Sequence, residues 1–113
     1  IVLFRYADAL LMKAEAQVRN GEDGNEVFNQ VRSRVEMPQK EATLENIIDE
    51  RLLELVWEGW RRNDMIRFGY FHKSYDMRTA LPEEANAYTT VFPIPSRAID
   101  LNPALKQNPG YKD

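Results

Sequence analysis

Apolar residues in the first part of the chain recur at the spacing of one helical face. Between Leu3 and Val18 they follow one another at steps of three or four residues, which predicts a helix over residues 3–20. The alanines among them are strong helix formers and leave room for a neighbouring helix to approach. Asn20 and Gly21 predict the end of this helix, because both residue types tolerate the left-handed conformation of a helix C-terminus.

A second, shorter apolar repeat follows. Valines placed four residues apart predict a helix over residues 25–36, with Asn25 as its N-cap. Pro38 ends the pattern because proline cannot continue a helix. The two helices and the glycine-containing turn between them span about 34 residues, the usual length of a tetratricopeptide-type repeat. We therefore predict a tetratricopeptide-like helical hairpin.

The third apolar stripe is the longest. It runs from Leu44 to Phe68 and predicts a long third helix, with Thr43 as its N-cap and Gly69 as its stop. Gly59 lies inside this range. It marks a place where the helix can break or kink, or where another element approaches too closely to allow a Cβ atom.

The remainder of the chain predicts no long regular element. Residues 70–90 show no clear period, and two prolines force residues 91–95 into an extended conformation. Ser96 is suited to cap one helical turn over residues 97–100. The predicted fold class is therefore all-α: a tetratricopeptide-like hairpin, a long third helix and an irregular, proline-rich C-terminal tail, in one domain over residues 1–113.

Composition narrows the class of protein. The 113 residues are 43% hydrophobic and 29% charged, which is typical of a folded domain and not of a disordered chain. The net charge of -3, with no basic stripe, argues against a nucleic-acid partner. The chain has no cysteine, which excludes a disulfide, a thiolate zinc site and a thiol nucleophile. It lacks an initiator methionine and a signal-peptide pattern, so we expect a fragment of a longer protein.

The third predicted helix carries an unusual density of charge. Glu50, Glu54 and Glu58 lie four residues apart, and paired carboxylates can perform acid–base chemistry on glycosidic bonds. Such a pair must flank its substrate, however, whereas these three residues are neighbours on one helix face. Nearby arginines would also keep them ionised. We therefore favour structural ion pairing over catalysis, and we predict no catalytic residue.

This charge is too abundant for a purely solvated face beside an apolar stripe and two tryptophans. We predict that part of it is buried and pairs between elements, with the first helix supplying the partners of the third. The residues of this predicted ion-pair scaffold are Arg5, Asp8, Arg51, Glu58, Arg61, Asp64 and Arg67.

Candidate ligand contacts are few. His72 is the only histidine, and a surface or packing role is favoured because a metal site needs several ligands. No phosphate loop, nucleophile elbow or zinc motif is present, so we predict neither a metal nor a cofactor. Tyr75 and Tyr88 lie on the irregular segment, where an exposed ring could stack on a sugar. They are the only ligand-binding candidates that the sequence offers.

Four stretches, taken together and in this order, resemble the C-terminal part of the SusD/RagB family. These stretches cover nearly the whole chain, and they are RYADALLMKAEA at residues 5–16, NQVRSR at 29–34, ERLLELVWEGWRRNDMIRFG at 50–69, and the FPIP, NP and QNPGY segments within 92–111.

The resemblance implies an α-helical fold with tetratricopeptide-like helix pairs. It also implies a non-enzymatic protein that binds glycans, or in some members peptides, at the surface of the outer membrane of Bacteroidota-type bacteria. The implied partner is a SusC-like TonB-dependent transporter, and the implied membrane attachment is a lipid anchor outside this chain. Two alternatives remain open on the residues alone: a helical-repeat module that binds a peptide or protein, and a hydrolase fragment that uses the glutamate row.

Overall fold

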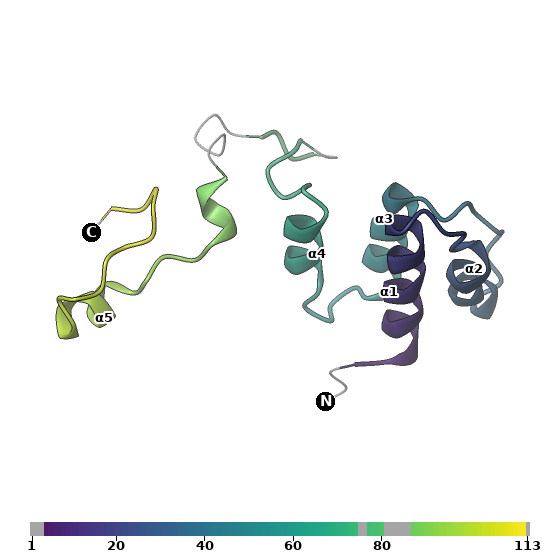
Figure 1. The fold of residues 1–113 in the computed structure, drawn as a ribbon, viewed down its shortest axis with the longest axis horizontal. Coiled ribbons are helices and arrows are strands. Elements are labelled where there is room, and N and C mark those ends of the chain that lie inside the picture. The colour runs from purple at the N-terminus through teal and green to yellow at the C-terminus, as the bar shows by residue number, and fades with distance from the viewer. Residues whose placement is uncertain (1–3, 75–76, 81–86, 113) are drawn as a thin grey trace. The chain divides into compact units, whose positions relative to one another are not determined.

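The computed structural model describes residues 4–74, 77–80 and 87–112, and helices are the regular elements in these ranges (Figure 1). The all-α class is confirmed. The chain divides into two compact units, residues 1–68 and 69–113. The helices of the first unit are α1 (Tyr6–Arg19), α2 (Asn25–Arg34), α3 (Leu44–Glu54) and α4 (Arg61–Arg67). The second unit contains a single 3-10 turn, η2 (Tyr88–Thr90), and α5 (Ser96–Leu101) among its described residues.

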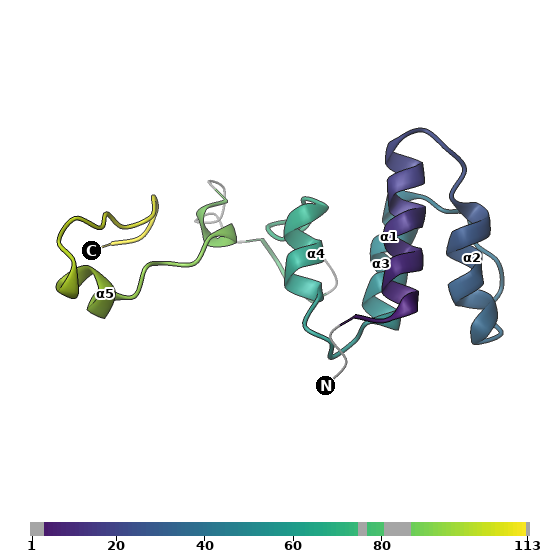
Figure 2. The same cartoon turned by 60° about the horizontal axis from the view of Figure 1, so that its bottom comes forward.

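The core of the first unit forms where α1 packs against α2 and α3, which run beside it (Figures 1 and 2). The buried parts of the three predicted apolar stripes meet in this core, and Phe28, Leu11 and Ile47 are its largest fully buried side chains. Burial of this apolar surface is the main force that holds the three helices together. The remaining members of the core cluster are Ala14, Val27, Val31 and Ala42.

The connections of the hairpin use polar side chains to hold the backbone. Asn25 is the first residue of α2 and not its N-cap, as the sequence had predicted, because Gly24 occupies the cap position. The Asn25 side chain instead accepts a hydrogen bond of 2.7 Å from the Ala42 backbone N–H, and so it ties the α2–α3 connection to the start of α2. Thr43 caps α3 as predicted, accepting from the Asn46 backbone N–H at 3.1 Å.

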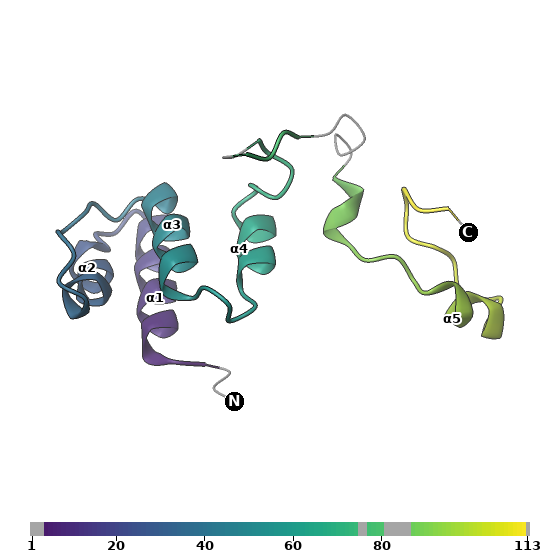
Figure 3. The same ribbon diagram turned by 180° about the vertical axis from the view of Figure 1, so that it is seen from behind.

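The predicted long third helix is wrong in one respect: α3 and α4 are separate helices, joined by a turn over residues 55–60 (Figure 3). The φ angle is +66° at Trp57 and +82° at Gly59, and a right-handed helix cannot continue through such residues. Glycine adopts this conformation at no steric cost, whereas tryptophan does so against its preference. The apolar stripe continues on both sides of the break, which is why the pattern had suggested one helix.

The second unit is organised by side chains that hydrogen-bond to an extended segment. Gln107 pairs with both backbone groups of Ile94, accepting from its N–H at 2.8 Å and donating to its C=O at 2.9 Å. Asn108 donates to the Phe92 carbonyl at 2.8 Å. The proline-forced extension of residues 91–95 is thus held by amide side chains, much as a neighbouring strand would hold it. α5 begins at Ser96 itself, with Pro95 at the cap position.

The close approach of α1 and α2 gives a first prediction. A Cβ atom on Gly24 would lie 2.9 Å from the Ala14 backbone oxygen and 3.2 Å from a Val18 methyl group. Gly24→Ala should therefore destabilise the protein by about 1–3 kcal/mol, measured by urea unfolding. Glu22→Ala, an exposed change in the same connection, is the control and should stay within about 0.5 kcal/mol of the parent. Equal stability of the two variants would contradict this packing.

Candidate functional site

A buried arginine lies at the centre of the first unit. Arg51, on α3, donates from Nη1 to Asp8 of α1 at 2.7 Å and from Nε to Asp64 of α4 at 2.9 Å. All three side chains are only 2% exposed. A charge removed from water at this depth needs charged partners with good hydrogen-bond geometry, and Arg51 has one on each side. One side chain therefore links three helices.

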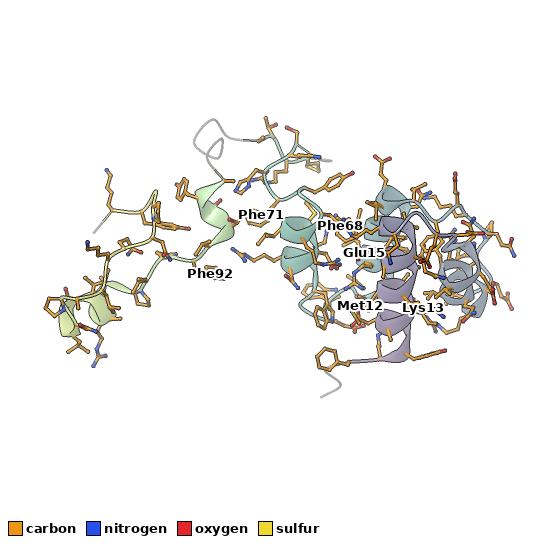
Figure 4. All side chains as sticks on the ribbon, viewed as in Figure 1. Met12, Lys13, Glu15, Phe68, Phe71 and Phe92 are labelled. Atoms are coloured by element: carbon orange, nitrogen blue, oxygen red, sulfur yellow. The ribbon has the colours of Figure 1, made fainter. Side chains whose placement is uncertain are left out.

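The ion pairs continue beyond Arg51 along α4 and back to α1. Arg67 donates to the second oxygen of Asp64 at 3.0 Å and also pairs with Glu15 of α1. Glu15 of α1, labelled in Figure 4, is buried. It also accepts a hydrogen bond of 2.7 Å from Arg19, one helical turn further along α1. We call Asp8, Arg51, Asp64, Arg67, Glu15 and Arg19 the central network.

The ion pairs of Arg67 oppose loss of its proton. Burial works against the charged form of Arg67, but hydrogen bonds to Glu15 and Asp64 outweigh it, so the pKa of Arg67 lies above the ordinary arginine value. A raised arginine pKa contributes stability at all pH values below the ordinary one, and this stability is lost only in strong alkali. The Arg67 guanidinium therefore stays charged throughout the neutral range.

A second ion-pair cluster joins the beginning of α1 to the end of α3. Arg5 donates from Nε to both oxygens of Glu58, at 2.9 and 3.0 Å, and also pairs with Glu54. Arg34, at the end of α2, donates to Glu54 at 2.9 Å. Hydrogen bonds to Glu58 and Glu54 raise the pKa of Arg5. Glu54 is thus shared between arginines from two other elements.

The glutamate row has no arrangement suited to acid–base catalysis. Glu50 pairs with Arg32, which is buried and also donates to the Pro38 carbonyl. Together with the pairs of Glu54 and Glu58, this gives every member of the row an arginine from outside α3. A general acid or base needs a substrate position beside it, whereas each of these carboxylates already faces an arginine.

Six of the seven residues proposed for the scaffold fall into two groups. The structure brings Asp8, Arg51, Asp64 and Arg67 together, and separately Arg5 with Glu58. Arg61 instead donates a hydrogen bond of 3.2 Å to the Ile48 carbonyl.

Sequence reasoning missed Glu15 as a member of the central network. The position of Glu15 in the sequence could have indicated this role. Asp8, Leu11 and Glu15 follow one another at steps of three and four residues, so Glu15 shares a helix face with a buried leucine and a predicted partner. Arg19 lies four residues further along the same face and pairs with Glu15.

The candidate ligand residues lie in the second unit. Tyr75 falls outside the described residues. The ring of Tyr88 packs edge-on against Tyr111, with the ring centres 5.0 Å apart, and a Cβ on Gly110 would lie 2.4 Å from the same ring. His72 pairs through Nε2 with the Thr89 hydroxyl at 2.7 Å. Tyr88 therefore takes part in the internal packing of its unit.

The described residues contain neither a group of metal-ligand side chains nor a membrane-spanning helix. Within these ranges no three His, Cys, Asp or Glu side chains are grouped as a metal site would require. None of the described helices has the length and apolar character needed to cross a membrane.

In the first unit, two ion-pair clusters join helices whose buried apolar faces form one core. A sequence profile of the SusD family matches residues 1–111, and the chain belongs to that family. This confirms the resemblance carried by the four sequence stretches.

Individual relatives agree with the family match. The starch-binding protein SusD of Bacteroides thetaiotaomicron is 36% identical over 99% of this chain and 22% of its own length. Two SusD-like proteins of Formosa agariphila are each 32% identical over 98% of this chain, and over 24% and 25% of their own lengths. The chain thus spans about a quarter or less of the proteins it matches.

Arg51 provides the test of the central network. Arg51→Met leaves the carboxylates of Asp8 and Asp64 buried without their shared partner, so we expect a loss of about 3–5 kcal/mol in urea unfolding. Arg34→Met is the control. The Arg34 side chain is 59% exposed, so its pair with Glu54 should contribute no more than about 1 kcal/mol. Losses of similar size for both variants would show that Arg51 is not the centre of the scaffold.

Proposed function

We propose that this chain is the helical C-terminal part of a glycan-binding protein at the surface of the outer membrane. The observation that carries the proposal is the SusD family match over residues 1–111, supported by a starch-binding relative that is 36% identical across nearly the whole chain. The full-length protein would capture oligosaccharides for uptake and would not cleave them. Its membrane attachment would be a lipid anchor outside this chain.

The contribution of this chain to that function would be a rigid scaffold. Its buried charges pair with one another, and the one described tyrosine candidate, Tyr88, packs inside its own unit. Groups that are used internally cannot also be presented to a ligand without loss of structure. Most sugar contacts of the full-length protein would then come from segments outside residues 1–113.

The proposed partner is a SusC-like TonB-dependent transporter in the same membrane. Family membership supports this pairing, since SusD-type binding proteins are expected to work with such a transporter. A peptide ligand in place of a glycan is the second possibility for the captured nutrient. The helical-repeat alternative, a module that binds a peptide or protein groove, has no support from the comparisons.

Glycan binding is tested on the full-length protein by affinity electrophoresis in gels that contain soluble starch or another polysaccharide from a panel. We expect at least one polysaccharide to retard the protein, and isothermal titration with the matching oligosaccharide to give a saturable signal. Retardation by none, together with binding to a peptide mixture, would support the peptide-binding alternative.

The same preparations also report on catalysis. We expect no release of reducing sugar from any polysaccharide that retards the protein. Glu54→Gln should change only the stability of the protein, because it alters the pairs of Glu54 with Arg5 and Arg34. Hydrolysis that Glu54→Gln abolishes, at an unchanged melting temperature, would show that the glutamate row is catalytic.

The transporter partnership is tested by affinity purification of the tagged full-length protein from detergent-solubilised outer membranes of its natural host. Mass spectrometry should find a TonB-dependent transporter as the main co-purifying protein. A tagged outer-membrane protein of unrelated function, expressed at the same level, is the control. Equal recovery of the transporter with both tagged proteins would contradict a specific complex.

A further inference from the structure

We draw no further inference here: the strongest candidate, the cleft of about 550 Å³ between α1 and α4 that Met12, Trp60 and Arg19 line, carries none, because its charged groups already belong to the central network and nothing in the structure shows what covers its open side.

Discussion

The guanidinium of Arg51 is the group on which the first unit depends. It is held between Asp8 and Asp64, with all three side chains 2% exposed, so each of these charges has given up water and depends on its ion pairs for compensation. Removing such a charge from water costs several kcal/mol, and only close, well-oriented partners offset that cost. α1, α3 and α4 must therefore meet in one arrangement for the network to form.

The central network and the second ion-pair cluster, which contains Arg5, join different elements of the first unit. The first joins α1, α3 and α4 through Asp64 and Arg67, and the second ties the chain before α1 to the end of α3 through Glu54. Apolar burial brings the helices together without specifying much geometry, whereas directional ion pairs select one geometry. This division explains how a small apolar core can hold a defined scaffold, and why so many charged residues serve structure here.

The sequence predicted the helices well and their connections less well. Apolar periodicity located α1, α2 and the start of α3, because each helix buries one face of its own residues. The break before α4 was not located in full, since the stripe continues through it and only Gly59 hinted at a change. The positive φ of Trp57 had no signal in the sequence, because tryptophan does not favour that conformation.

The candidate site shows the same contrast between what the sequence predicted and what the tertiary structure decided. From its residues alone the chain determined its all-α class, its helical hairpin and an excess of charge beside an apolar stripe, because these follow from local spacing. Only the tertiary structure decided which charges meet. Arg51 and Asp8 are 43 residues apart in sequence, and Glu15 and Arg67 are 52 apart. Such pairings depend on how the helices pack, and periodicity along one helix carries no information about its neighbours.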